Sequence, residues 1–298
     1  NQVCKSFVPN PKLVDSEYLY YWLKAHKTEI ENLGVGATFK EVNKKTVESI
    51  EIFLPPLSEQ KRIAAILDSA DAIRTKRKAA IEKLDQLAQS VFYEMFGDPF
   101  DDDFEGHERV AFGDIADRIT YGFTQPMSHL TEGIPIITAK NIQPRRIDFD
   151  NVDYTSCEDF ETLTEKSKPE NGDILISKDG AIGRSAAVKD SRVFCISQAV
   201  TLVKPKKYLV DSQYLESYLQ LESVQKRFKE MAKGNAIPHL QITELAKFPI
   251  SLPSIRDQQE FVARIKQHSQ VLQLHEKSIG IEESLFYSLQ HRAFAGEL

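Results

Sequence analysis

Three segments of the chain place glycine beside cationic, amide or aromatic side chains. They are residues 121–125 (Tyr-Gly-Phe-Thr-Gln), 178–184 (Lys-Asp-Gly-Ala-Ile-Gly-Arg) and 233–239 (Lys-Gly-Asn-Ala-Ile-Pro-His). Cations next to glycine suit a phosphate that passes close to the backbone, and amides can hydrogen-bond a base edge at two points. Each segment taken alone is better interpreted as an ordinary surface turn. The three segments are nevertheless the candidates for contact with nucleic acid.

Catalytic motifs are absent from the sequence. Residues 34–39 (Gly-Val-Gly-Ala-Thr-Phe) begin like a dinucleotide-binding fingerprint but end in phenylalanine, so a turn is the better interpretation. Ser58-Glu-Gln-Lys61 fits a Ser-x-x-Lys pattern, yet it opens a helix, where Ser58 is expected to be the N-cap. No Walker phosphate-binding loop occurs, and no Asn/Asp-Pro-Pro-Tyr run of an amino-methyltransferase. We therefore expect no catalytic residues, metal or cofactor on this chain.

The composition is that of an ordinary globular protein, with 298 residues of which 41% are hydrophobic and 28% charged. No stretch is apolar enough for a membrane span, and the first residues do not resemble a signal peptide. Cys4, Cys157 and Cys195 form no CxxC pair. We expect them to be small buried side chains in a reducing, cytoplasmic compartment, without disulfides or zinc.

The net charge of −6 gives no support to nucleic-acid binding, because DNA-binding domains are often basic. Acids gather in residues 98–117 and 148–170. Several cations lie in stretches with fewer acids, namely Lys140, Arg145, Arg146, Lys178, Arg184, Lys204, Lys206 and Lys207. A local basic groove can still hold phosphates on an acidic protein.

The elements that position these side chains belong to a long internal repeat. Residues 13–19 (LVDSEYL) recur as 209–215 (LVDSQYL) at an offset of 196, and 52–57 (IFLPPL) recur as 250–255 (ISLPSI) at an offset of 198. So long a period implies duplication of a domain together with its helix, and not a solenoid. Because Asn1 aligns inside the second copy, we expect the natural protein to extend upstream by about a hundred residues.

Two long helices are expected, one in each copy. Apolar residues recur every three or four positions from 59 to 95, which predicts a helix with one continuous apolar seam that ends at Gly97. The second pattern runs from 257 to 294, with Asp257 and Glu260 as the expected capping box. The helices are expected to pair antiparallel; the alternative is that each covers its own domain.

The two seams differ in quality. The first comprises Ile63, Ile66, Leu67, Ala70, Ile73, Ala80, Ile81, Leu84, Leu87, Ala88, Val91, Phe92 and Met95. The second comprises Phe261, Ile265, Leu272, Ile279, Leu285, Phe286 and Leu289. Three polar residues interrupt it: His268, Ser269 and His275. We expect the second helix to pack more weakly along this seam.

Between the helices, short apolar runs alternate with Gly, Asp and Asn, which predicts a mixed α/β domain. Strands are expected at 134–137, 173–177 and 194–197, and residues 214–228 have helical spacing. The fold class is therefore α+β with internal duplication. Four parts are expected: the second half of a first domain (1–57), a coiled-coil helix (58–97), a complete second domain (98–256) and a second coiled-coil helix (257–298).

Several of these motifs resemble, in the same order, those of type I restriction–modification specificity (S) subunits. Residues 54–60 (LPPLSEQ), followed by a helix that ends in 90–99 (SVFYEMFGDP), resemble the central conserved region of that family. Residues 172–184 (GDILISKDGAIGR) and 197–200 (SQAV) resemble motifs of its target recognition domains, and 293–298 (AFAGEL) resemble its C-terminus. The resemblance covers essentially the whole chain.

The resemblance implies a non-catalytic subunit that binds double-stranded DNA with a bipartite target. In that family, two target recognition domains each read one half-site in the major groove. The two helices form an antiparallel coiled coil that docks methyltransferase (M) subunits, and restriction (R) subunits complete the enzyme. S-adenosylmethionine, ATP and Mg are then expected on the partner subunits. Residues 1–57 would be only the second half of the first target recognition domain.

The resemblance and the positions of the three segments together predict the DNA contacts. The predicted residues are Tyr121, Thr124, Gln125, Lys140, Asn141, Arg145, Lys178, Arg184, Lys233, Asn235 and His239. The cations among them are expected to contact phosphates. Base contacts are expected from Gln125, Asn141, Asn235 and His239.

Two other functions are compatible with the sequence. One is the target-recognition portion of a single-chain methyltransferase or restriction enzyme whose catalytic part lies upstream. The other is a coiled-coil adaptor that does not bind DNA, although the glycine-rich cationic segments do not favour it.

Overall fold

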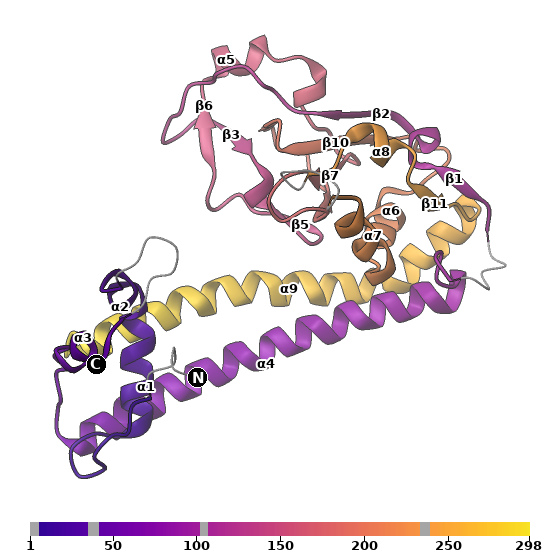
Figure 1. The fold of residues 1–298 in the computed structure, drawn as a ribbon. Coiled ribbons are helices and arrows are strands. Elements are labelled where there is room, and N and C mark those ends of the chain that lie inside the picture. The colour runs from indigo at the N-terminus through magenta and orange to yellow at the C-terminus, as the bar shows by residue number, and fades with distance from the viewer. Residues whose placement is uncertain (1–5, 35–41, 102–106, 233–238) are drawn as a thin grey trace. The chain divides into compact units, whose positions relative to one another are not determined.

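The computed structural model describes residues 6–34, 42–101, 107–232 and 239–298. The chain divides into two compact units: Asn1–Asp85 with Gln270–Leu298 (unit 1), and Gln86–Ser269 (unit 2). Two 40-residue helices, α4 (Leu57–Phe96) and α9 (Ile255–Phe294), each contribute to both units (Figure 1). The prediction of an α+β chain with two long helices is confirmed.

The caps of the long helices differ from those predicted. Helix α4 begins at Leu57, and the N–H groups of Glu59 and Gln60 bond to the Pro56 carbonyl at 2.8 and 3.0 Å. Ser58 therefore lies in the first turn, and its prediction as N-cap is wrong. Leu57, the first helical residue, directly follows Pro55 and Pro56.

Helix α9 begins at Ile255, two residues before the predicted start. Ser254 Oγ accepts from the Asp257 N–H at 3.2 Å and its hydroxyl donates to Asp257 Oδ2 at 2.7 Å. The predicted Asp257/Glu260 capping box is therefore wrong, because Ser254 occupies the N-cap position and Asp257 is its partner. Each long helix is followed within two residues by a glycine with positive φ, 73° at Gly97 and 76° at Gly296, which ends it in the usual way.

Unit 1 is helical. It contains α1 (Ser16–Ala25), α2 (Lys27–Asn32), α3 (Lys44–Glu48) and parts of α4 and α9. Its core consists of Tyr18, Tyr21, Ile63, Ala64, Leu67, Phe286 and Ala293. The long helices run antiparallel there, since Arg62 near the start of α4 bonds to the carbonyl of Leu298, beyond the end of α9. The predicted antiparallel pair is confirmed within this unit.

Unit 2 contains all eleven strands of the described residues. They are β1 (Arg109–Ala111), β2 (Ala116–Tyr121), β3 (Ile134–Ile137), β4 (Ile142–Gln143), β5 (Arg146–Ile147), β6 (Asp153–Thr155), β7 (Ile174–Ser177), β8 (Ser185–Ala187), β9 (Cys195–Ile196), β10 (Val200–Pro205) and β11 (Pro249–Ser251). The main sheet has the order β2-β10-β7-β8 and is antiparallel. A second sheet has the order β6-β3-β9, and β1 pairs with β11 and β4 with β5.

The helices of unit 2 cover and connect these sheets. They are α5 (Cys157–Thr162), α6 (Ser212–Leu219), α7 (Glu222–Ala232), α8 (Ile242–Ala246) and the short 3-10 turns η1 (Phe112–Ile115), η2 (Ala139–Asn141) and η3 (Glu165–Ser167). The helical spacing predicted for 214–228 thus belongs to two helices that meet at Gln220. Phe92 and Phe96 of α4 pack with Tyr214 and Phe261 in the largest core of the unit.

The duplication is visible in the hydrogen bonds as well as the elements. In unit 1, the side chain of Gln60 is 1% exposed. Its Oε1 accepts from the Asp15 N–H at 2.9 Å, and its Nε2 donates to the carbonyls of Leu13 and Pro55 at 2.9 and 2.8 Å. The amide thereby ties the start of α1 to the start of α4.

Unit 2 repeats this arrangement around Gln258, which is fully buried. Its Oε1 accepts from the Asp211 N–H at 2.8 Å, and its Nε2 donates to the carbonyls of Leu209 and Pro253 at 3.0 and 2.8 Å. Every partner is the repeat counterpart of its equivalent in unit 1. Two copies of one local structure, and not merely similar motifs, therefore lie in this chain.

Two predictions about burial are wrong in part. Cys195 is buried but Cys157 is exposed at the start of α5, so the prediction of uniformly buried cysteines does not hold. In the seams, Ile73, Leu87 and Leu285 are 54%, 42% and 56% exposed. Neither apolar seam is therefore continuous. In unit 1, charged side chains lie between the two long helices in the middle of the pair.

Candidate nucleic-acid interface

One edge of the main sheet gathers several of the predicted residues. Tyr121 at the end of β2 is opposite Thr201, and Ser177 at the end of β7 is opposite Val200. Because the sheet is antiparallel, the loops after β2 and β7 and the turn before β10 meet at this edge. We call it the loop edge, and its principal side chains are those of Tyr121, Lys166, Lys178, Gln198 and His239.

Backbone hydrogen bonds hold the loop edge together. The Lys178 N–H donates to the carbonyl of Ala199, in the turn before β10, at 2.9 Å. The Gly122 N–H donates to the Val200 carbonyl at 3.3 Å. His239 forms an antiparallel bridge with Asp179. Four segments far apart in the sequence are thereby held next to one another.

Gly122 is a position where only glycine fits. A Cβ atom there would lie 1.8 Å from the Ile196 carbonyl oxygen and 2.7 Å from that of Ser197. The close approach lets the loop after Tyr121 follow the strand β9 and the turn beyond it. The glycine predicted to permit close approach of a ligand instead permits close approach of the protein's own backbone.

Two ammonium groups approach the ring of Tyr121. It is 40% exposed, with Lys166 Nζ 5.6 Å and Lys178 Nζ 5.9 Å from its centroid. Both distances fall within the range of cation–π attraction. Lys178 Nζ also lies 3.5 Å from Asp179 Oδ2, in a partly buried ion pair whose side chains are 21% and 41% exposed. The edge thus offers an aromatic surface flanked by positive charge.

A second group of cations lies around the loop between β7 and β8. Arg184 Nη1 donates to Gln143 Oε1 at 3.0 Å. Arg184 and Lys229 line a shallow cavity of about 480 Å³, and none of the described residues that line it is a carboxylate. Arg145, in the adjacent β4–β5 turn, has a φ of 59°. Such backbone conformations are uncommon outside glycine and tend to occur at functional sites.

The remaining predicted residues lie elsewhere or are not available for DNA. Asn141 is 1% exposed; its Oδ1 accepts from Thr138 N and Oγ1, and its Nδ2 donates to the Asn151 carbonyl at 2.9 Å. Its prediction as a base contact is wrong, because it is a buried partner in the capping box of η2. Lys140 is exposed but lies 3.7 Å from Asp153 on the second sheet.

Thr124 and Gln125 are exposed in the loop after β2, and Gln125 Nε2 donates to Thr162 Oγ1 of α5 at 3.1 Å. This bond is accessible to solvent, so the amide can exchange it for another partner. Lys233 and Asn235 lie outside the described residues.

The cations at the opposite end of β10 are already engaged. Lys204 Nζ lies 2.9 Å from Asp173 and 3.1 Å from Glu170. Burial raises the pKa of Asp173 despite this cation, whose hydrogen bond acts in the opposite direction. Lys206 and Lys207 donate to backbone carbonyls at 2.9 and 3.2 Å. The cationic stretches of the sequence therefore do not merge into one basic groove.

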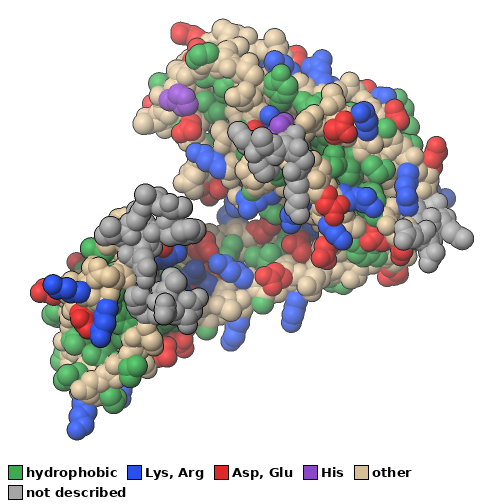
Figure 2. All heavy atoms as spheres, viewed as in Figure 1, with side chains coloured by type: hydrophobic (Ala, Val, Ile, Leu, Met, Phe, Trp, Pro, Cys, Tyr) green, Lys and Arg blue, Asp and Glu red, His purple; other side chains and the backbone are tan. Residues whose placement is uncertain are grey.

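The surface agrees with this separation. On the face shown in Figure 2, Lys and Arg side chains alternate with Asp and Glu instead of gathering into one patch. Long-range attraction by a broad basic field is thus not a feature of this face.

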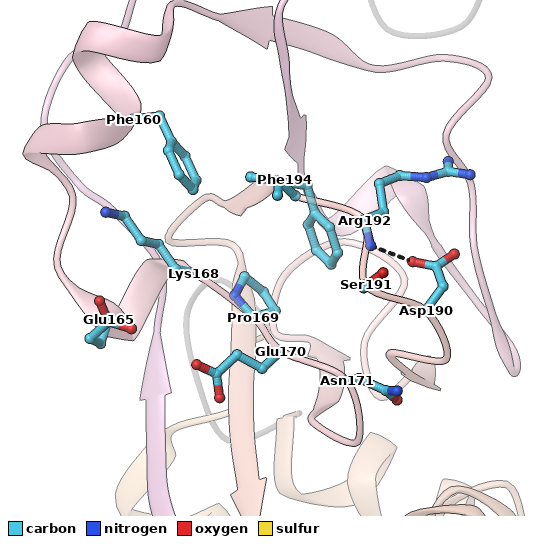
Figure 3. A pocket seen from close by; sticks show the side chains of 11 residues that line it. Phe160, Glu165, Lys168, Pro169, Glu170, Asn171, Asp190, Ser191, Arg192 and Phe194 are labelled. Atoms are coloured by element: carbon cyan, nitrogen blue, oxygen red, sulfur yellow. Dashed lines mark hydrogen bonds between the residues drawn. The ribbon is translucent and has the colours of Figure 1, made fainter.

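A different cavity, of about 390 Å³, lies beside α5. Phe160 and Phe194 enter it from separate elements, with Lys168 and Arg192 near them (Figure 3). Both cations stack on aromatic rings, Lys168 on Phe160 at 4.7 Å and Arg192 on Phe149 at 4.1 Å. Three carboxylates also line the cavity: Glu165, Glu170 and Asp190. This mixture of charges does not suit a phosphate.

Sequence reasoning missed Lys166, Gln198 and Lys229. Gln198 lies in the predicted motif at 197–200, and its exposed position in a turn between two strands could have suggested it. Nothing in the sequence places Lys166 over Tyr121, because that contact requires η3 to fold against β2. Among the described residues, no helix is long and apolar enough to cross a membrane. No cluster of three potential metal ligands occurs in the same part of the chain.

Comparison with known proteins identifies the family. The family model described as "Type I restriction modification DNA specificity domain" matches residues 1–83 and 112–283. The chain therefore belongs to the type I restriction–modification DNA specificity family. The two matched segments agree with the internal duplication.

Individual relatives carry the same description. The chain is 26% identical to the type I restriction enzyme EcoBI specificity subunit of Escherichia coli, over 100% of this chain and 68% of that protein. It is 23% identical to the MjaVIII specificity subunit of Methanocaldococcus jannaschii, over 89% of this chain and 66% of that protein. The chain thus spans about two-thirds of the length of these relatives.

The fold is also similar to a solved structure. A type I restriction–modification S subunit from M. genitalium aligns with a TM-score of 0.55 and 20% identity, over 96% of this chain and 74% of that chain. At this identity the likeness concerns the fold. The alignment covers nearly all of both units.

Proposed function

We propose that this chain is the non-catalytic subunit that gives a type I restriction–modification enzyme its DNA specificity. In this proposal, unit 2 reads one half of a bipartite target through the loop edge. The observation that carries the proposal is the grouping of Tyr121, two ammonium groups and the turn that carries the exposed Gln198 on one edge of the main sheet. Membership of the specificity family supports it.

The dimensions of the loop edge suit duplex DNA. Three strand spacings separate β2 from β8, which amounts to about 14 Å. The major groove of B-DNA is about 12 Å wide. The cations near Tyr121 and those near Arg184 can therefore contact phosphates on the two sides of one groove while the side chains between them face its floor.

The side chains divide into two roles. Lys166, Lys178 and Arg184 are assigned to phosphates, because an ammonium or guanidinium contact to phosphate carries little sequence information. Gln198 is assigned to a base edge, because a glutamine amide can pair with adenine at two points. Tyr121 supplies an apolar surface beside them. These assignments extend the predicted contacts with the residues that the sequence did not reveal.

The partner subunits complete the proposed enzyme. We assign docking of the M subunits to helices α4 and α9. The R subunits would then join the enzyme through the M subunits. S-adenosylmethionine, ATP and Mg are assigned to these partners, because the family supplies specificity and this chain carries no catalytic motif. A single-chain enzyme with an upstream catalytic part is distinguished by the mass of the natural product.

The test compares two pairs of lysines with equal charge. In complex with its M subunit, Lys166→Ala with Lys178→Ala removes two cations from the loop edge. Lys206→Ala with Lys207→Ala removes two from the opposite end of β10. The first pair should lower the slope of log affinity against log salt by about 2, and the second should leave it nearly unchanged. Equal slopes for the two variants contradict the proposed DNA surface.

A further inference from the structure

The centre of the helix pair in unit 1 is charged instead of apolar. Arg77 of α4 contacts Glu282 of α9 through two nitrogen atoms, with Nε and Nη2 at 2.7 and 2.6 Å from Oε1. The two side chains are only 25% and 19% exposed. An ion pair in this position is costly to desolvate, so it needs an explanation other than simple stability.

His275 of α9 completes the charged layer. Arg77 Nη1 lies 2.9 Å from His275 Nδ1, and arginine can only donate, so Nδ1 accepts and the imidazole proton is on Nε2. His275 is also the repeat counterpart of Arg77, at the offset of 198 that relates the two helices. A residue that contacts its own counterpart lies beside the local two-fold axis of the helix pair.

The charged layer breaks that two-fold symmetry. The counterpart of Glu282 is Leu84, so the symmetric equivalent of the Arg77–Glu282 ion pair would be His275 with Leu84. No second ion pair is therefore generated by the repeat. The two helices have similar backbones but are not interchangeable at this layer.

The consequence concerns pairing between copies of the chain. Because α4 and α9 are repeat counterparts, two α4 helices from different copies could pair with the same geometry. Arg77 would then face Leu84 and Arg77 of the second copy. A largely buried guanidinium would lose its carboxylate and meet a like charge, which is strongly unfavourable.

We propose that Arg77 and Glu282 specify the pairing of α4 with α9 of the same chain and prevent two copies from pairing through α4. A single polar position in a coiled-coil seam commonly selects the partner at a cost in stability. This inference concerns assembly of the chain itself and does not depend on how DNA is read. It explains why the apolar seam is interrupted where the two helices are related by symmetry.

The experiment replaces the pair by leucines and compares it with an exposed pair nearby. In Arg77→Leu with Glu282→Leu, no buried charge is left unpaired, so the helices can still form. The matched control is Lys78→Leu with Glu283→Leu, which removes an ion pair of 3.0 Å whose side chains are 53% and 41% exposed. Oligomeric state is measured by sedimentation equilibrium, and helix content by circular dichroism.

We expect the leucine variant to discriminate less between pairing of α4 with α9 of the same chain and pairing of α4 with α4 of a second copy. Its dimer dissociation constant should fall by on the order of tenfold to a hundredfold relative to the wild-type chain. The control should resemble the wild type, and the reversed pair, Arg77→Glu with Glu282→Arg, should remain monomeric. The proposal is overturned if the wild type already dimerises through α4, if the leucine variant stays monomeric, or if the control dimerises equally.

Discussion

The buried amide of Gln60 offers a quantitative test of the repeated local structure. Replacing Gln60 by alanine removes the partner of three groups in part-buried hydrogen bonds: the Asp15 N–H and the carbonyls of Leu13 and Pro55. A hydrogen bond of this kind contributes about 1 kcal/mol to stability. We therefore expect Gln60→Ala to lower the free energy of unfolding of unit 1 by about 3 kcal/mol.

Urea unfolding followed by tryptophan fluorescence measures this change. Trp22 is the only tryptophan in the chain and is buried in unit 1, so its emission reports that unit. Gln258→Ala should produce a similar loss in unit 2, followed by circular dichroism. Gln86→Ala, at an exposed position on α4, should change stability by less than about 0.5 kcal/mol.

A conservative variant separates the loss of hydrogen bonds from the loss of volume. In Gln60→Glu, a carboxylate can accept from Asp15 but cannot donate to the two carbonyls, so the folded state favours the protonated carboxyl. Its pKa would be raised on folding, and the variant should gain stability relative to wild type as pH falls. If Gln60→Ala costs less than about 1 kcal/mol, or if Gln60→Glu is insensitive to pH, the reasoning is refuted.

Three further predictions concern unit 2. Gly122→Ala should destabilise the loop edge and abolish DNA binding without loss of helix content, because its Cβ would overlap the Ile196 carbonyl; retained affinity in a filter-binding assay would contradict this. Asn141→Ala should lower the melting temperature by several degrees and leave the preferred DNA sequence unchanged, since its amide bonds are internal. Hydrogen bonds from Ser128 lower the pKa of Asp159. The ionised Asp159 carboxylate therefore stabilises the fold at pH values above the ordinary aspartate pKa. This contribution is lost as the pH falls through the lowered pKa of the folded state. Acid unfolding of Asp159→Asn should therefore be shallower than that of wild type, and identical curves would show that this carboxylate is not responsible.

The large-scale organisation could be predicted because it depends on spacing that the sequence displays directly. An offset of nearly constant size identifies the duplication, and three-to-four spacing identifies α4 and α9. The caps were predicted less well. Ser58 and Asp257 are both good capping residues by type, and only the positions of Pro56 and Ser254 decide where each helix begins.

The site was predicted less completely, for reasons of tertiary structure. Asn141 has the right side chain for a base contact, but Thr138 and the Asn151 carbonyl occupy its amide. Lys166 reaches Tyr121 only because η3 folds against β2. Neither contact can be predicted from composition or local spacing. In the same way, the reason for the interruption of the seam at His275 is its contact with Arg77 across the helix pair, which no local pattern predicts.

The central claim is that the loop edge of unit 2 reads DNA sequence. The most direct measurement is selection from random duplexes by the wild-type complex and by Gln198→Ala, followed by sequencing of the retained DNA. The account predicts one enriched half-site for the wild type, with preference relaxed at one or two base pairs in the variant. An unchanged half-site in Gln198→Ala, with affinity reduced equally for all sequences, would contradict base reading by this edge.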